Sequence, residues 1–268
     1  AALTLANQGF PVHLVERSAA LGGNLRHLHF GIEEMGAGSR LPRDAATGLV
    51  DPQTFLADLV SRVEAAPLVT VHLATELKSI GGIMGNFMTT LQPLADGGEP
   101  IEVRHGAAIL ATGGREYRGD EYGYGTDPGI VTQQQFEATL AECDAADLPA
   151  SVVMIQCVGP AERYCGRICC TSALKNALVL KQRRPDARVT VIYKDIRTYG
   201  FKERLYTAAR EAGVIFVHYE DDRAPVVDTA GDGVEVRVWE EILGREMTLR
   251  PDMLVLSTPV VPDAGAPE

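Results

Sequence analysis

The sequence predicts an α/β fold that contains two strand–turn–helix–strand units. The second unit gives the stronger signal, with an apolar strand at 151–156, an amphipathic helix at 171–181 and another apolar strand at 188–193. This order is typical of a βαβ unit in a parallel sheet. The first unit shows part of the same pattern, because a helix over 1–9 ends at a glycine and an apolar strand at 11–16 follows it.

The next elements of the first unit are predicted by local signals. Asp51 as N-cap and Pro52 in the first turn predict the start of a helix. A strand is expected at 69–73, and alternating stretches near 76–92 and 100–104 predict an antiparallel meander. An apolar run at 107–112 then predicts a buried strand that enters a glycine turn.

The second unit continues with a helix at 201–212, a strand at 214–217, a meander over about 225–249 and a strand at 253–258. The acidic, alanine-rich segment 137–148 is interpreted as the bridge between the units. The expected domains are 1–145 and 146–268. Because the chain opens within a helix, we expect a fragment truncated at both ends, in which the first unit lacks its first strand and glycine turn.

Composition excludes several classes of protein. The chain has 268 residues, 46% of them apolar, and a formal net charge of −11, which disfavours binding to nucleic acid or to an anionic membrane. No apolar run approaches the roughly 20 residues that span a bilayer. Four of the five cysteines lie in one cluster, unlike a secreted disulfide framework, so we expect a cytoplasmic protein.

The cysteine cluster lies in the turn between the strand 151–156 and the next helix. A dinucleotide-binding, or Rossmann-like, unit usually has Gly-x-Gly-x-x-Gly there, so that a pyrophosphate can approach the helix N-terminus. One strand end and one helix start would bring four thiolates together, which suits an iron–sulfur cluster, and nearby arginines would offset its charge. The candidate metal ligands are Cys157, Cys165, Cys169 and Cys170.

Three other interpretations of these cysteines stay open: a zinc site, a redox dithiol and buried structural thiols. A disulfide between the adjacent Cys169 and Cys170 would be strained, which weakens the dithiol interpretation.

The first unit carries a second set of candidate binding residues. Glu16 ends a buried strand where a Rossmann unit places the acid that binds ribose hydroxyls. A glycine pair permits close backbone approach to a ligand, and an arginine after it suits a phosphate. Together with Ala-Thr-Gly near residue 112, these segments resemble the FAD-binding segments of the glutathione reductase and thioredoxin reductase superfamily. The candidate cofactor-binding residues are Glu16, Arg17, Gly22, Gly23, Asn24, Arg26, Thr112 and Gly113.

The cysteine run, the segment 173–177 and the segment 195–200 together resemble the A subunits of the heterodisulfide reductase family. The resemblance implies a thioredoxin-reductase-like flavin domain with FAD and a four-iron (4Fe-4S) cluster held by the four clustered cysteines. It also implies that Lys175 faces the isoalloxazine as a catalytic residue. The ferredoxin-type Cys-x2-Cys-x2-Cys modules of fuller family members do not occur in this sequence.

The leading hypothesis is an oxidoreductase, an electron-transfer flavoprotein subunit that passes electrons between FAD and an iron–sulfur cluster. Its expected partners are other subunits of the complex and ferredoxin-like or hydrogenase-like redox proteins. The alternatives are an NAD(P)H-dependent FAD disulfide reductase and a non-catalytic scaffold subunit. The former is disfavoured because the second unit lacks phosphate-binding glycines and its strand at 188–193 is followed by Lys194 rather than by an acid.

Overall fold

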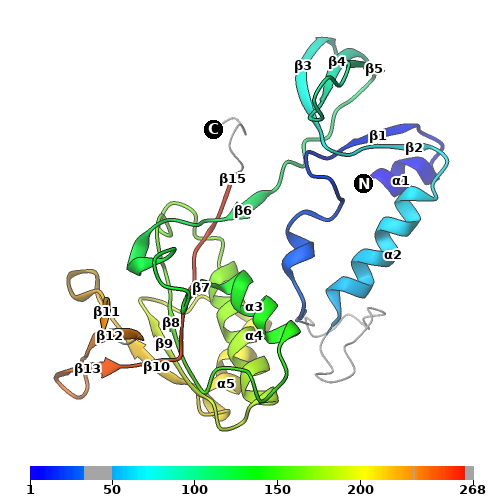
Figure 1. Cartoon of the computed structure of the whole chain (residues 1–268). Coiled ribbons are helices and arrows are strands. Elements are labelled where there is room, and N and C mark those ends of the chain that lie inside the picture. The colour runs from blue at the N-terminus through cyan, green and yellow to red at the C-terminus, as the bar shows by residue number, and fades with distance from the viewer. Residues whose placement is uncertain (33–49, 232, 263–268) are drawn as a thin grey trace. The chain divides into compact units, whose positions relative to one another are not determined.

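A computed structural model of the chain describes residues 1–32, 50–231 and 233–262 (Figure 1). They form two compact units, each considered by itself below. The first unit comprises 1–26 and 52–113, and the second comprises 27–51 and 114–268, apart from the stretches outside the described residues.

The first unit contains a small parallel sheet and an antiparallel meander. Its elements are α1 Ala2–Asn7, β1 Val12–Val15, the 3-10 helix η1 Gly23–His27, α2 Pro52–Glu64, β2 Val69–His72, β3 Thr75–Ile83, β4 Asn86–Pro93 and β5 Ile101–His105. Strands β1 and β2 pair in parallel, and β3, β4 and β5 pair antiparallel in chain order. Apart from η1, each of these elements was predicted from local sequence signals, with ends that differ by a few residues.

The stretch at 107–112, predicted as a buried strand, is irregular and exposed. Ile109 is 63% exposed and Leu110 is 77% exposed. An apolar run becomes a buried strand only where a neighbouring strand pairs with its backbone and another layer covers its side chains. Among the strands that the structure describes, none pairs with this stretch. The prediction was therefore wrong.

The second unit is built on a five-stranded parallel sheet with the order β10-β9-β8-β14-β7. Its helices and 3-10 helices are η2 Glu121–Gly123, α3 Gln133–Glu142, α4 Ile168–Arg183, η3 Gly200–Lys202, α5 Glu203–Glu211 and η4 Asp221–Arg223. Its strands are β6 Gly114–Glu116, β7 Ile130–Thr132, β8 Ser151–Ile155, β9 Arg188–Tyr193, β10 Ile215–His218, β11 Val226–Gly231, β12 Gly233–Glu240, β13 Arg245–Leu249, β14 Met253–Leu256 and β15 Val260–Pro262.

Both faces of this parallel sheet are buried. Met154 of β8 belongs to a core cluster with Phe136 of α3 and Leu174 of α4. The next residue, Ile155, points to the opposite face and belongs to a cluster with Val236 of the β11–β13 meander. Helices cover one face and the meander covers the other, which explains the continuous apolar runs of the strands.

The two compact units divide the chain differently from the expected domains 1–145 and 146–268. Strand β7 extends the sheet of the second unit beside β14, and α3 packs on α4. The segment 137–148, interpreted as a bridge, therefore contributes to this core. Helix α3 begins with a capping box in which Thr132 and Gln135 bind each other's backbone amides, a local signal that the sequence reasoning missed.

No helix within the described residues is long and apolar enough to cross a membrane.

Candidate functional site

The cysteine turn of the second unit, residues 157–170, connects the carboxyl end of β8 to the first turn of α4. Two residues of this turn that are not glycine adopt the left-handed conformation: Cys157 has φ of 60° and Arg167, the N-cap of α4, has φ of 61°. Such residues cost about 1–3 kcal/mol each and persist where the surrounding structure holds them. Gly159 also has a positive φ, and a Cβ there would collide with the ring of Tyr117.

The four clustered cysteines lie in one neighbourhood, and none forms a disulfide. Cys170 Sγ donates to the carbonyl oxygen of Asp195 at 3.8 Å, and Arg197 Nη1 lies 3.6 Å from Cys165 Sγ. The thiols of Cys169 and Cys170 share a hydrogen bond, and Cys157 lies close enough to Cys165 and Cys170 that their charges affect its pKa. The turn and the segment 195–197 therefore surround the thiols with both sulfur and N–H groups.

The environment of these thiols shifts their pKa values in different directions. The pKa of Cys170 is lowered to about 7 because a hydrogen bond from Cys169 favours its thiolate, although burial opposes this. That same hydrogen bond raises the pKa of Cys169, and burial adds to the effect. Burial also raises the pKa of Cys157, with smaller contributions from Cys170 and Cys165. One thiolate in this group is thus favoured near neutral pH and further ionisation is opposed.

The chemistry of this donor set fits an iron–sulfur cluster, because its ligands are thiolates and its surroundings supply N–H donors. In this conformation, however, the described residues form no group of three or more His, Cys, Asp and Glu side chains poised to hold a metal ion. The predicted convergence on one point is not found. Cys169 and Cys170 are consecutive on α4, so their side chains start about 100° apart around the helix, and each thiol takes a protein hydrogen-bond partner instead.

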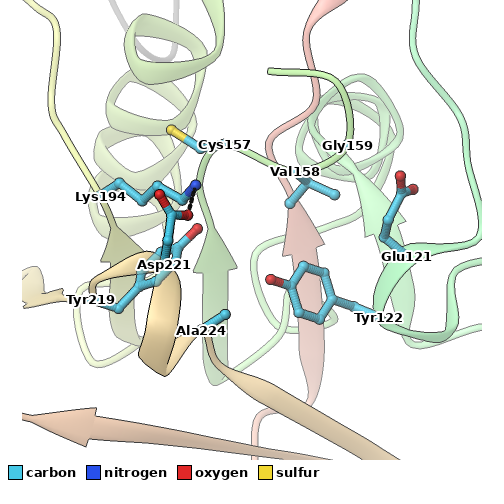
Figure 2. Close-up of a pocket in the computed structure, with 9 residues that line it drawn as sticks. All are labelled: Glu121, Tyr122, Cys157, Val158, Gly159, Lys194, Tyr219, Asp221 and Ala224. Carbon is cyan, nitrogen blue, oxygen red and sulfur yellow. Dashed lines mark ion pairs between the residues drawn. The ribbon is translucent and has the colours of Figure 1, made fainter. Parts of the chain in front are cut away.

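A cavity of about 500 Å³ opens beside Cys157 at the carboxyl ends of β8, β9 and β10 (Figure 2). Lys194 and Asp221 point toward each other in it and form an ion pair, and Glu162 lies 3.8 Å from the same ammonium. Its lining residues are Glu121, Tyr122, Cys157, Val158, Gly159, Lys194, Tyr219, Asp221 and Ala224.

Two tyrosines contribute aromatic surface to this cavity. Tyr219 donates to the carbonyl oxygen of Gln156 at 3.0 Å, and burial raises the pKa of its hydroxyl. Tyr122 adopts φ of 56°, and burial raises its pKa as well. The sequence reasoning missed both, because they come from irregular segments far from β8 in the chain. Of the lining residues, the sequence analysis named Cys157 as a candidate ligand and noted Lys194 directly after the strand that became β9.

Lys175 lies in the buried core of the second unit. Its Nζ is 2.6 Å from Glu137 Oε2 and donates to the carbonyl oxygen of Phe30 at 2.8 Å. The other oxygen of Glu137 accepts from the backbone amides of His29 and Phe30. Burial lowers the pKa of Lys175, and the Glu137 carboxylate partly opposes that shift. Glu137, which the sequence reasoning missed, thus joins α3, α4 and residues 29–30 through one carboxylate.

Several predicted FAD residues lie together in the first unit. Glu16 accepts a hydrogen bond from the backbone amide of Ser18 at 2.7 Å, and Arg26 donates to the Ser18 hydroxyl at 3.3 Å. Gly22 has φ of 121°, and a Cβ there would lie 2.9 Å from Arg26 Cγ and from a methyl group of Leu56, so any other residue would strain the backbone and force these side chains to shift. Gly23, with φ of 50°, begins η1.

The remaining predicted FAD residues are placed less closely. Arg17 pairs weakly with Glu76 at 4.0 Å and is largely exposed. Asn24 lies within η1 and takes part in at least one interaction. Thr112 and Gly113 lie in the exposed stretch after β5, outside any strand. Hydrogen bonds thus connect the residues of the Glu16–Arg26 segment, whereas the Ala-Thr-Gly segment at 111–113 belongs to no strand.

The chain is similar to several curated A subunits of heterodisulfide reductases. It is 33% identical to the A subunit of the ferredoxin:CoB-CoM heterodisulfide reductase of Methanosarcina acetivorans, over 62% of this chain and 26% of that protein. The chain is 31% identical to the A subunit of the H(2):CoB-CoM heterodisulfide,ferredoxin reductase of Methanothermobacter marburgensis, over 63% of this chain and 28% of that protein. The chain is 26% identical to an iron-sulfur A subunit of the CoB–CoM heterodisulfide reductase of Methanopyrus kandleri, over 97% of this chain and 51% of that protein. The chain thus spans about a quarter to a half of these relatives. No family model matches it.

Solved structures with the same fold include two thioredoxin reductases. The enzyme from T. acidophilum superposes with a TM-score of 0.62 at 15% identity, over 98% of this chain and 73% of its own. The Lactococcus lactis enzyme superposes with a TM-score of 0.61 at 17% identity, over 97% of this chain and 73% of its own. This likeness confirms the predicted α/β fold of two Rossmann-like units of the glutathione/thioredoxin reductase type.

Proposed function

We propose that this chain, a relative of the heterodisulfide reductase A subunits, passes electrons between FAD bound by its first unit and a four-iron cluster bound by its second. Its likeness to these relatives and its fold support an oxidoreductase of the flavoprotein type. The observation that carries the finer proposal is the set of four free thiols where β8 meets α4. This crevice at the carboxyl ends of parallel strands is where open α/β sheets bind ligands.

In the first unit, the residues proposed to bind FAD are Glu16, Arg17, Gly22, Gly23, Asn24, Arg26, Thr112 and Gly113. Glu16 directly follows β1, and its carboxylate accepts from the Ser18 amide, which supports a role in accepting hydrogen bonds from ribose hydroxyls. The backbone at Gly22 has no side chain to keep a phosphate away. Arg26 adds a fork of donors to the same segment.

In the second unit, the residues proposed to hold the cluster are Cys157, Cys165, Cys169 and Cys170. When bound, the flavin and the cluster supply the electron-accepting chemistry. The chain itself must bring Cys169 and Cys170 out of their mutual hydrogen bond and lose the thiol protons as thiolates form. Arg197 and the backbone around Asp195 then face the sulfur atoms.

Lys175 is the residue proposed to face the flavin ring. In this structure its ammonium is bound by Glu137, so any action on the flavin requires release from that carboxylate. The lowered pKa that burial imposes on Lys175 would favour a proton-transfer role after such release.

The proposed partners are other subunits of an electron-transfer complex, since the relatives are named as A subunits and their names include ferredoxin and H2. Ferredoxin-like or hydrogenase-like proteins fit this role, and the cytoplasm is the proposed location.

The deciding experiment is anaerobic reconstitution with iron, sulfide and FAD, followed by measurement of bound iron, sulfide and flavin. We expect about four iron and four sulfide per chain. Cys169→Ala should lose most of this iron, whereas Cys143→Ala, which changes the cysteine outside the cluster, should keep it. Equal iron uptake by the parent and Cys169→Ala, or none by either, would show that the cluster assignment is wrong. Flavin content tests the first unit separately.

A further inference from the structure

We propose that the open edge of β10 binds an extended segment of a partner protein as an added strand, with an acidic side chain of that segment in a pocket beside Arg210. The strand, Ile215–His218, is the outermost strand on one side of the parallel sheet of the second unit. The inference goes beyond the proposed function, because it requires neither a flavin nor an iron–sulfur cluster.

The outer edge of β10 presents backbone groups that can take a further strand. β10 pairs in parallel with β9, and among the strands that the structure describes none pairs with its other side. The Tyr219 amide donates to the carbonyl oxygen of Tyr193, so Val217, two residues earlier, also directs its amide and carbonyl groups to β9. The amide and carbonyl groups of Phe216 and His218 therefore point away from β9, to the open edge.

The sequence of this strand lacks two of the features that usually protect an open edge. Proteins commonly prevent pairing at an edge strand with proline or with charged side chains. Residues 214–219 include no proline and no Asp, Glu, Lys or Arg, and Ile215 is 55% exposed. With four residues, β10 offers its hydrogen bonds to one short segment rather than to a long strand.

A pocket of about 510 Å³ lies beside this edge, on the face of the sheet that the helices cover. Its lining residues are Tyr193 of β9, Phe216 of β10, Val214, and Tyr206 and Arg210 of α5. The ring of Phe216 meets that of Tyr206 edge to face with 4.8 Å between ring centres, and the centre of the Tyr193 ring lies 6.2 Å away. Phe216 thus belongs to the open edge through its backbone and to the pocket through its side chain.

The polar groups of the pocket favour an acidic occupant. Arg210 is exposed and forms no ion pair within the part of the chain that the structure describes; its guanidinium carbon lies 5.7 Å from the centre of the Tyr206 ring. A guanidinium can bind a carboxylate through two parallel hydrogen bonds while its face stacks on a ring. The hydroxyls of Tyr193 and Tyr206 are the other side-chain donors of the lining. A carboxylate is therefore the group that complements this pocket.

The geometry of strand addition connects the open edge with the pocket. Residues directly opposite each other on paired strands direct their side chains to the same face of the sheet. The residue of an added strand opposite Phe216 would thus bind its backbone and point its side chain to the α5 face, where the pocket lies. The residues before and after it would point to the other face, on which Ile215 is exposed. In this arrangement the main-chain hydrogen bonds provide affinity and the pocket provides specificity.

The test uses the full chain, isotope-labelled for NMR, and a synthetic peptide of sequence Thr-Val-Thr-Glu-Thr-Val-Thr. A matched peptide has Gln in place of Glu. Titration gives the affinity, and amide hydrogen exchange identifies the backbone N–H groups that the peptide protects. Arg210→Gln removes the guanidinium from the pocket. Arg188→Gln is its control, because this exposed arginine lies at the amino end of β9, whereas Tyr193 of the pocket lies at the carboxyl end.

We expect the Glu peptide to slow exchange at Phe216 and His218 and to leave Val217 unchanged, because the Val217 amide already bonds to β9. Gln in the peptide, or Arg210→Gln in the chain, should each weaken binding about tenfold, since a charge-assisted hydrogen bond is lost. The two changes together should weaken binding little more than either alone. Arg188→Gln should bind the Glu peptide as the parent does.

Absence of saturable binding by the Glu peptide, or protection at amides other than those of Phe216 and His218, would overturn the proposal. Equal affinity of Arg210→Gln and Arg188→Gln for the Glu peptide would overturn the role of the pocket. Self-association of the chain, with Phe216 and His218 protected when no peptide is present, would assign the edge to a second copy and would equally overturn the proposal. The assay contains no iron or flavin, so none of these outcomes depends on the proposed cofactors.

Discussion

The Glu16–Arg26 segment of the first unit and the cysteine turn of the second both follow the carboxyl end of a parallel strand, but their structures are maintained differently. The first uses glycine and short-range hydrogen bonds, such as that from the Ser18 amide to Glu16. The second contains left-handed residues with side chains and is attached to the segment 195–200. The sheet behind it is buried on both faces. The cysteine turn, which has the less favourable backbone geometry, thus lies in the unit whose sheet is buried on both faces.

The largest expected effect comes from the buried pair behind the cysteine turn. Lys175→Met should lower the free energy of unfolding of the second unit by about 3–5 kcal/mol, because Glu137 stays buried without its cation. Urea denaturation at neutral pH measures this loss.

The double variant Lys175→Met with Glu137→Gln provides the matched control. The amide removes the uncompensated charge and still accepts from the backbone of residues 29 and 30. It should recover part of the stability. A loss below about 1 kcal/mol in the single variant would show that the pair does not support this core.

A smaller effect is expected at the acidic end of β1. Glu16→Ala should weaken FAD binding by about 1.5–3 kcal/mol, roughly 10- to 150-fold in Kd, because charge-assisted hydrogen bonds to the ribose are lost. Flavin fluorescence titration measures the affinity. Glu102→Ala, an exposed carboxylate on β5, should leave the affinity unchanged. Equal affinity in Glu16→Ala and the parent would refute the assignment of Glu16.

The glycine pair of the first unit allows a matched steric test. Gly22→Ala should cost about 1–3 kcal/mol more stability than Gly23→Ala. Both glycines have positive φ, but only at Gly22 would a Cβ press on Arg26 and Leu56, whereas at Gly23 it meets open space. Thermal unfolding of the two variants gives the difference. Similar losses would mean that backbone strain alone, not close packing, explains the glycine at 22.

The smallest expected effect concerns pH and the first unit. His13 Nδ1 lies 2.9 Å from His72 Nε2, between the neighbouring strands β1 and β2. Partial burial lowers the pKa of His72, and repulsion from His13 lowers it further by a smaller amount. A lowered folded-state pKa means that the unfolded chain binds the proton more readily, so stability should fall as pH drops through about 6.5.

The loss should stay below about 1 kcal/mol because the pair is largely exposed to solvent. Unfolding monitored at pH 7.5 and 5.5 measures it, and His72→Gln should remove most of the dependence. An unchanged pH dependence in His72→Gln would assign the effect to other groups.

The sequence alone determined the elements whose signals are local. The apolar runs of β8, β9 and β14 predicted strands, and Asp51 with Pro52 predicted the start of α2. The strand–turn–helix–strand order predicted the parallel sheet and placed the cysteine turn at its carboxyl edge. Periodicity, caps and glycines act within a few residues of each other, so they can be read without knowledge of the rest of the chain.

Only the tertiary structure decided which distant residues meet. The pairing of Lys175 with Glu137, of Arg197 with Cys165, and the placement of Tyr122 and Tyr219 around the cavity join residues from separate elements. The failure of the strand at 107–112 has the same origin, because an apolar run is necessary for a buried strand but pairing and cover must come from elsewhere. Burial and pairing energies depend on the packing of the whole chain, and no local pattern encodes them.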